Sequence, residues 1–155
     1  MTVFRCVPIA TDTAERFRRT CADDNGNALR RMVSAGRFPC RHCLRLAREG
    51  EEVLLGSYNL TGPLGIYWTP SPIFVHAEPC ERFALADEVP EIVRASLVSV
   101  RSYDANDQCL YDLGEAVEGP DVDGPLARAI TDPRTKFVNI HTAKPGCLLV
   151  RVERG

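Results

Sequence analysis

The C-terminal part of the chain has the clearest alternation of apolar and polar residues. Across residues 137–152 the alternation is interrupted only by a Lys-Pro-Gly turn, which predicts a β-hairpin. With a loop at residues 142–146, Ile140 faces Leu148 and one side of the hairpin is a continuous aliphatic surface. A slip of one residue would move that surface into water, so the pattern specifies the register.

On the other side of the hairpin, the same register places His141 opposite Cys147. Directly opposed residues in an antiparallel pair have Cβ atoms about 4.5–5.5 Å apart, which is within reach of a thiol–imidazole contact. A neighbouring imidazole can take the proton of a cysteine and activate it as a nucleophile. The pair is therefore a candidate for catalysis, and the alternative is a purely structural pairing at the neck of the hairpin.

The N-terminal third is predicted to hold most of the helices. Asp12 followed by Glu15 is typical of a capping box, and it would open a helix with a core-facing stripe of Ala14, Phe17 and Cys21. Two further helices are predicted over residues 27–35 and 39–49. The last of them would have an apolar face and an arginine face, made of Cys40, Cys43, Leu44 and Ala47 and of Arg41, Arg45 and Arg48.

Short strands dominate the rest of the chain. The long loop 59–71 contains Tyr67 and Trp68 and could close over a site. Strands joined by hairpins favour a single α+β domain over residues 1–155, with an antiparallel or mixed β-sheet. The patterns predict strands at 3–9, 51–58, 72–77, 96–103 and 109–117, and a short helix at 126–130. Residues 90–94 are either a short helix or a crossing segment.

The composition is that of a soluble globular protein, with 45% hydrophobic and 26% charged residues. No apolar run approaches the ~20 residues of a membrane span, and the N-terminus lacks the apolar core of a secretory signal. We therefore expect a cytoplasmic protein, in which the 7 cysteines stay reduced. An odd number of cysteines also argues against a closed disulfide framework.

The formal net charge of −2 conceals an uneven distribution. Residues 1–50 and 126–155 are basic, whereas residues 51–125 carry fourteen acids against three arginines. The basic segments have few aromatic residues of the kind that stack on bases. We therefore expect the charges to neutralise one another across the fold, and we do not expect nucleic-acid binding.

All three histidines lie near cysteines along the chain. Cys40-x-x-Cys43 and His76-x-x-x-Cys80 supply two pairs of thiolate and imidazole ligands, which tetrahedral zinc takes. The alternative is that these cysteines are small buried hydrophobes. Cys-x-x-Cys at the start of a helix is also a redox motif, but no strand–helix–strand unit precedes it here.

Several spaced motifs, taken in order, resemble a known family. They are Pro39-Cys40-Arg41-His42-Cys43-Leu44, Gly50-Glu51 before Val53-Leu54-Leu55, Pro72-Ile-Phe-Val-His76, Arg101-Ser-Tyr-Asp104, and His141 with Gly146-Cys147. In this order they are similar to the bacterial family called domain of unknown function 1203, over nearly the whole chain. The resemblance implies a single cytosolic bacterial domain and brings no established activity.

Three hypotheses about function stay open. The first is a polar pocket that binds a small anionic molecule, with Arg41 and Arg101 as anion contacts, loop 59–71 as a partial lid, and a lining of Cys40, Arg41, His76, His141 and Cys147. The second is a zinc-stabilised interaction module without catalysis, with the ligands Cys40, Cys43, His76 and Cys80. The third is a thiol hydrolase or transferase with Cys147 as nucleophile and His141 as base. Zinc is the only cofactor that the sequence indicates.

Overall fold

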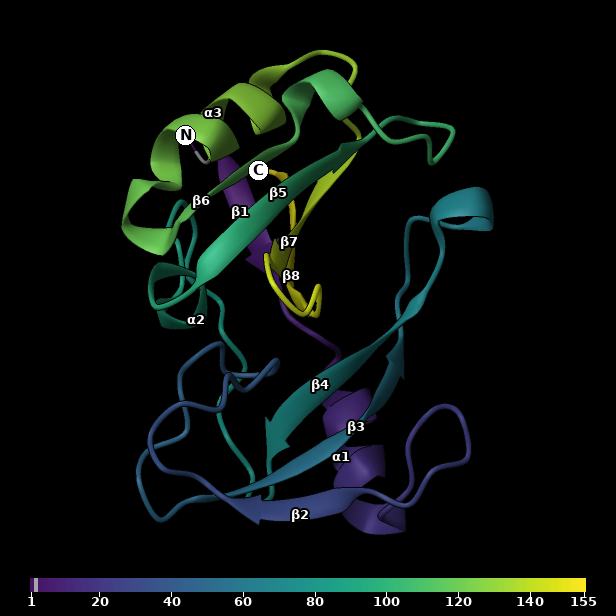
Figure 1. Cartoon of the computed structure of the whole chain (residues 1–155), viewed down its shortest axis with the longest axis vertical. Coiled ribbons are helices and arrows are strands. Elements are labelled where there is room, and N and C mark those ends of the chain that lie inside the picture. The colour runs from purple at the N-terminus through teal and green to yellow at the C-terminus, as the bar shows by residue number, and fades with distance from the viewer. Residues whose placement is uncertain (2) are drawn as a thin grey trace.

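The computed structural model describes Met1 and residues 3–155, which form two antiparallel β-sheets (Figure 1). The larger sheet has the order β1–β8–β7–β5–β6, with the bounds Phe4–Val7 (β1), Leu148–Arg154 (β8), Phe137–Thr142 (β7), Leu97–Tyr103 (β5) and Glu115–Glu118 (β6). The smaller sheet has the order β2–β3–β4, with the bounds Arg30–Val33 (β2), Glu52–Asn59 (β3) and Pro70–His76 (β4). The α-helices are Thr11–Thr20 (α1), Glu91–Arg94 (α2) and Asp123–Thr131 (α3), and short 3₁₀ turns lie at Gly65–Tyr67, Tyr111–Leu113 and Gly119–Asp121. The predicted α+β class, with its antiparallel strands and C-terminal hairpin, is confirmed.

One face of the larger sheet is covered by α3 (Figure 1). The alternation in the central strands explains this arrangement, because Val100, Ile140 and Val150 are at most 1% exposed and belong to one hydrophobic cluster with Leu126 and Ile130 of α3. Only the 3₁₀ turn Gly119–Asp121 and Val122 separate β6 from α3. The apolar stripe of the helix therefore closes over the sheet where the chain returns from its edge.

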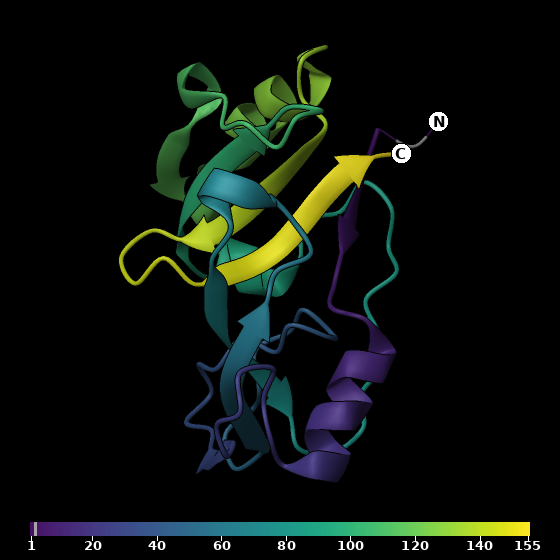
Figure 2. The same cartoon turned by 90° about the vertical axis from the view of Figure 1, so that its right-hand side faces the viewer.

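The smaller sheet packs against α1 (Figure 2). Ala14 and Phe17 are fully buried and contact the cluster formed by β3 and β4, as the apolar stripe predicts. Cys21, the third member of that stripe, is exposed, because the helix ends at Thr20 and Cys21 adopts a left-handed conformation. The predicted capping box is also wrong, since the N-cap is Ala10 and Asp12 lies within the first turn.

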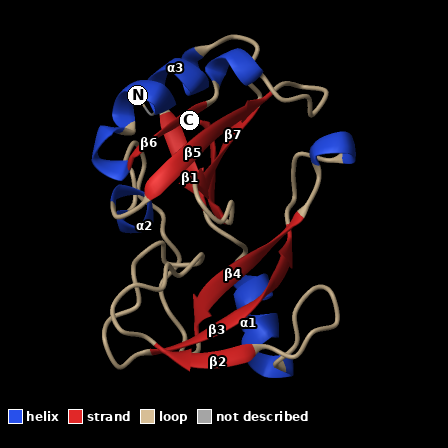
Figure 3. Cartoon of the chain, in the orientation of Figure 1, coloured by secondary structure: helices blue, strands red, loops and turns tan. Residues whose placement is uncertain are grey.

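The other two helices predicted in the N-terminal third are absent from the described residues, so the prediction that most helices lie there is wrong. Residues 30–33 form the edge strand β2, which pairs with β3, and residues 39–49 form a loop (Figure 3). In this loop the N–H of Cys40 donates to the carbonyl of Arg45, and the N–H of Arg41 donates to the carbonyl of Phe74. Pairing with distant parts of the chain thus replaces the hydrogen bonds of a helix.

The closing hairpin keeps most of its predicted aliphatic surface but has a different register. Ile140 pairs with Val150 instead of Leu148, a shift of two residues. Val138, Ile140 and Val150 share one hydrophobic cluster as predicted, whereas Leu148 belongs to the cluster of the smaller sheet. A β-bulge after Ile140 then places His141 opposite Leu148, so the predicted pairing of His141 with Cys147 is wrong. An extra residue in one strand changes the partner of every residue beyond it.

The two sheets are joined at the start of β8, where the N–H of Leu148 donates to Ser71 Oγ of β4 at 2.9 Å.

The strand predicted over 109–117 is shorter than expected, because residues 111–113 form a 3₁₀ turn before β6. Within the described residues, no helix is long and apolar enough to cross a membrane.

Candidate metal centre

Four side chains with metal-binding atoms meet beside the smaller sheet. They are Cys40 and Cys43 in the loop after β2, His76 at the end of β4, and Cys80 in the segment that follows. One ligand atom of each lies within 4.8 Å of the corresponding atoms of the others. Cys40, Cys43 and His76 are buried and Cys80 is half-buried. The fold therefore brings together the four residues that the sequence predicted as metal ligands, and they could bind a metal.

The loop presents both sulfur atoms from a tight turn. The N–H of Leu44 donates to the carbonyl of Cys40 at 3.0 Å, and Leu44 has a φ of +58°. A left-handed conformation is uncommon for a residue with a branched side chain, and such residues concentrate at functional sites. Leu44 is fully buried, so its packing against the larger core holds the turn in place.

Two separations between ligand atoms can be compared with those of a tetrahedral zinc site. The sulfur atoms of Cys40 and Cys80 are 3.9 Å apart, and Cys43 Sγ lies 3.5 Å from His76 Nδ1. With Zn–S bonds of about 2.3 Å and Zn–N bonds of about 2.0 Å, a tetrahedral zinc ion separates two sulfurs by about 3.8 Å and a sulfur from a nitrogen by about 3.6 Å. Both observed separations agree with these values.

The cluster carries negative charge on the sulfur atom of Cys40. Hydrogen bonds from Cys43 and Cys80 lower the pKa of Cys40 far below its ordinary value. The Cys40 thiolate in turn raises the pKa of Cys80, and it raises the pKa of His76 to about 10. A metal cation among these groups would replace the proton of His76 as the charge that balances the thiolate.

Hydrogen-bond donors surround the sulfur atoms. Arg18 of α1 donates to Cys80 Sγ at 3.5 Å, and the N–H of His76 donates to Cys40 Sγ at 3.4 Å. His42 Nδ1 lies 3.2 Å from Cys80 Sγ, and its Nε2 lies 2.8 Å from the hydroxyl of Thr11. Burial lowers the pKa of His42, which favours a neutral ring. In the tautomer with its proton on Nδ1, this ring would donate to Cys80 Sγ and accept from Thr11. Such donors stabilise thiolate ligands.

A carboxylate lies behind the imidazole ligand. Glu51 Oε1 is 3.6 Å from His76 Nε2, on the side of the ring away from Cys43. A carboxylate in this position orients a histidine ligand and raises its basicity. Arg18, His42 and Glu51 are supporting residues that the sequence did not predict. His42 lies inside the Cys-x-x-Cys motif, but nothing in the sequence places Arg18 or Glu51 near it.

Arg41, the predicted anion contact, is buried and only 2% exposed. Its Nε donates to the carbonyl of Leu148 at 2.7 Å, and one terminal nitrogen donates to the carbonyl of Pro39 at 2.6 Å. Burial lowers its pKa to about 10, which still leaves the guanidinium charged at neutral pH. These contacts use Arg41 as a link between the cysteine loop and β8.

The remaining predicted site residues lie on or beside the hairpin. His141 Nδ1 donates to the carbonyl of Gly146 at 2.9 Å, and burial and Arg101 lower the pKa of His141 to about 4. Arg101 donates from Nε to Ser99 Oγ at 3.1 Å. Among the described residues, the thiol of Cys147 has no hydrogen bond to His141, and its reactivity stays a prediction.

The predicted lid is held by contacts of its own. The hydroxyl groups of Tyr67 and Tyr111 are 2.6 Å apart, and the indole N–H of Trp68 donates to the carbonyl of Leu60 at 3.0 Å. These contacts attach the loop to the turn before β6 and to its own first residues.

Comparison with known proteins gives one relationship. Neither a curated protein nor a solved structure matches the chain. Residues 37–154 match the family described as "Protein of unknown function (DUF1203)". This stretch contains all four candidate metal ligands, whereas α1 with Arg18 precedes it. Because the match extends over most of its length, the chain belongs to the DUF1203 family.

Proposed function

We propose that this protein is a zinc-stabilised domain in which Cys40, Cys43, His76 and Cys80 bind one Zn²⁺ ion. The observation that carries the proposal is the convergence of the four ligand atoms within 4.8 Å of one another. Three thiolates and one imidazole are a ligand set of structural zinc sites. The separations of 3.9 Å and 3.5 Å within the cluster support the same metal geometry.

The ligand count favours a stabilising role over a catalytic one. Four protein ligands complete a tetrahedron and leave no position for water or a substrate, whereas catalytic zinc has three protein ligands. The ion would join the loop after β2, the end of β4 and the segment that follows β4. Because residues 34–51 have no helix or strand of their own, the metal would supply cohesion that regular hydrogen bonds do not supply there. We therefore propose a zinc-stabilised interaction module.

Metal analysis of the purified protein tests this proposal. We expect elemental mass spectrometry to find one zinc ion per chain. After replacement of zinc by Co²⁺, the visible absorption spectrum should be that of tetrahedral cobalt with thiolate ligands. Cys43→Ser should lose the stoichiometric metal and the cobalt spectrum. Cys109→Ser is the matched control, because Cys109 is a half-buried free thiol outside the cluster, and it should retain both.

Removal of the metal supplies a second readout. A strong chelator should lower the melting temperature of the wild-type protein and leave that of Cys43→Ser unchanged, because metal bound only by the folded state adds to stability. Protein that is prepared from zinc-supplemented cells and contains no stoichiometric metal would contradict the proposal. Retention of metal by Cys43→Ser would contradict the ligand assignment.

A further inference from the structure

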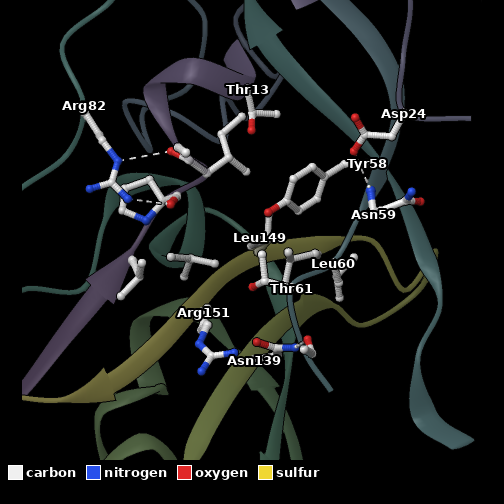
Figure 4. A pocket seen from close by; sticks show the side chains of 17 residues that line it. Thr13, Asp24, Tyr58, Asn59, Leu60, Thr61, Arg82, Asn139, Leu149 and Arg151 are labelled. Atoms are coloured by element: carbon white, nitrogen blue, oxygen red, sulfur yellow. Dashed lines mark hydrogen bonds between the residues drawn. The ribbon is translucent and has the colours of Figure 1, made fainter. Parts of the chain in front are cut away.

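A second site lies away from the cysteine cluster, in a cavity between the two sheets. The cavity has a volume of about 320 Å³ and lies between the start of α1, the end of β3 and strand β8 (Figure 4). This volume is within the usual range for small-molecule sites, and it equals roughly ten water molecules at about 30 Å³ each. It therefore has room for a molecule of roughly ten non-hydrogen atoms.

One buried polar atom in the wall of the cavity has no partner. Asn139 is 1% exposed and donates from Nδ2 to the carbonyl of Gly62 at 3.0 Å. That bond fixes Oδ1 as the free acceptor, and Oδ1 has no hydrogen-bond partner. A buried acceptor left without a donor costs about 1–3 kcal/mol, so an arrangement that keeps one points to a missing donor.

A guanidinium lies beside this acceptor. Arg151 is the direct cross-strand partner of Asn139, and both line the cavity (Figure 4). Nε of Arg151 donates to Glu153 at 2.7 Å, and its guanidinium carbon lies 3.9 Å from the centre of the Phe137 ring. Within the described part of the chain, neither terminal nitrogen of Arg151 has a hydrogen-bond partner. Two such nitrogens suit the oxygens of a carboxylate.

Tyr58 adds a second donor for an anion. Its side chain is largely buried, and its ring extends into the cavity toward Leu149 and Thr61 (Figure 4). Burial raises the pKa of Tyr58, so the hydroxyl keeps its proton at neutral pH. The hydroxyl forms no hydrogen bond with any described residue and is free to donate.

The other two charged side chains on the wall, Asp24 and Arg82, already have hydrogen-bond partners. Asp24 accepts from Arg16 at 2.5 Å and from the N–H of Asn59 at 2.9 Å. Arg82 donates to the carbonyls of Ile9 and Pro8. The start of α1 also faces the cavity through Ala10, which has no side-chain cap. The groups that remain available to a ligand are the terminal nitrogens of Arg151, the hydroxyl of Tyr58, the acceptor Asn139 Oδ1, and the hydroxyls of Thr13 and Thr61.

From this arrangement we infer that the cavity binds a small 2-hydroxy carboxylate with an aliphatic side chain. The carboxylate accepts from Arg151 and Tyr58, and the hydroxyl donates to Asn139 Oδ1. The aliphatic part lies against the apolar wall, which includes Leu60 and Leu149. An amino acid fits less well, because its ammonium group would lie beside the guanidinium of Arg151.

Titration of the full chain as purified, with its metal content measured separately, tests the inference with matched probes. The first probe is 2-hydroxy-4-methylpentanoate, and we expect saturable binding that shifts the NMR signals of the Asn139 side chain and the Gly62 amide. The second probe, 4-methylpentanoate, lacks the hydroxyl donor and should bind about fivefold more weakly or worse. The third, 2-hydroxy-4-methylpentanamide, lacks the charge and should bind about tenfold more weakly or worse.

Two variants assign the contacts to their residues. Tyr58→Phe should weaken binding of the hydroxy acid about fivefold, and Arg151→Gln about tenfold or more. Arg19→Gln is the matched control, because Arg19 is exposed on α1 and lies outside the cavity, and it should bind like the wild type.

The wild-type titrations decide the inference even if a variant fails to fold. Equal affinity for the hydroxy acid and 4-methylpentanoate would overturn it, and so would the absence of saturable binding. Unchanged affinity in a folded Arg151→Gln variant would overturn it as well. These outcomes are independent of the zinc proposal, which is tested by metal content.

Discussion

The Nε atom of Arg41 lies 2.7 Å from the carbonyl oxygen of Leu148, a residue 107 positions further along the chain. This bond ties the loop that carries Cys40 and Cys43 to the first residue of β8. The N–H of Leu148 is held in turn by Ser71 Oγ of β4. The start of β8 is therefore the point where the cysteine loop, the smaller sheet and the larger sheet are connected.

Replacement of Arg41 by lysine should destabilise the protein by about 2 kcal/mol or more. A single ammonium group cannot donate to the carbonyls of both Leu148 and Pro39 in the geometry of the guanidinium, so one buried acceptor loses its partner. Urea unfolding of Arg41→Lys gives the change in free energy. Arg45→Lys is the control, because Arg45 is exposed in the same loop, and it should lie within about 0.5 kcal/mol of the wild type. Equal stability of the two variants would show that the link does not stabilise the fold.

Replacement of Arg18 by glutamine should weaken metal binding without abolishing it. Arg18 donates to Cys80 Sγ at 3.5 Å and from Nε to the carbonyl of His76 at 3.0 Å. Loss of such supporting contacts typically lowers metal affinity by about 10- to 100-fold. Competition with a chromophoric chelator measures the affinity, and Arg19→Gln on the same helix should match the wild type. An unchanged affinity in Arg18→Gln would remove Arg18 from the metal centre.

The stability of the protein should fall between pH 6.5 and pH 4 because of His141. Burial and Arg101 lower the pKa of His141 to about 4 in the folded protein, whereas an unfolded histidine has a pKa of about 6.5. In this range the unfolded chain binds a proton that the folded protein does not bind. The contribution of neutral His141 to the free energy of unfolding is therefore complete above pH 6.5. It is lost as the pH falls toward 4, and the loss amounts to at most about 3 kcal/mol.

His141→Asn isolates this effect from other acid-sensitive groups, the metal ligands included. Asparagine offers an N–H close to the position of Nδ1, so the bond to the carbonyl of Gly146 is retained while the titration is removed. Urea unfolding of both proteins at pH 7 and pH 5 measures the slope of stability with pH. The slope should be smaller in the variant, and identical slopes would exclude His141 as its source.

Gly119→Ala should destabilise the fold by about 1–3 kcal/mol. A Cβ atom at this position would collide with the carbonyl oxygens of Val93 and Arg94, which belong to the backbone of α2 and cannot move aside cheaply. Gly124→Ala is the matched control, because its nearest neighbour is the flexible end of Arg128 at 3.4 Å, and alanine favours the helix at that position. The melting temperature of Gly119→Ala should be lower than that of the wild type, whereas the melting temperature of Gly124→Ala should not be lower. Equal melting temperatures would mean that α2 is displaced at little cost.

The local pattern of apolar and polar residues was enough to predict two kinds of element. These are hairpins, whose paired strands are near in sequence, and helices or strands with a strictly periodic apolar face. The alternation in residues 137–152 predicted the hairpin and its aliphatic surface, because a two-residue period is a property of the strand itself. Ala14 and Phe17 were placed in the core for the same kind of reason. The spacing of Cys40, Cys43, His76 and Cys80 also indicated a metal set before the fold was known.

Tertiary structure decided what depends on distant partners. Residues 39–49 have the apolar spacing of a helix, but the N–H of Arg41 bonds to Phe74 and Leu44 takes a positive φ, so the segment forms a turn that presents both sulfurs. A single bulge removed the predicted pairing of His141 with Cys147. The supporting role of Arg18 and the cavity beside Asn139 depend on residues that come together only when both sheets are assembled. Sequence spacing fixes which residues share a face, whereas contacts between elements are set by packing and long-range hydrogen bonds that no local period encodes.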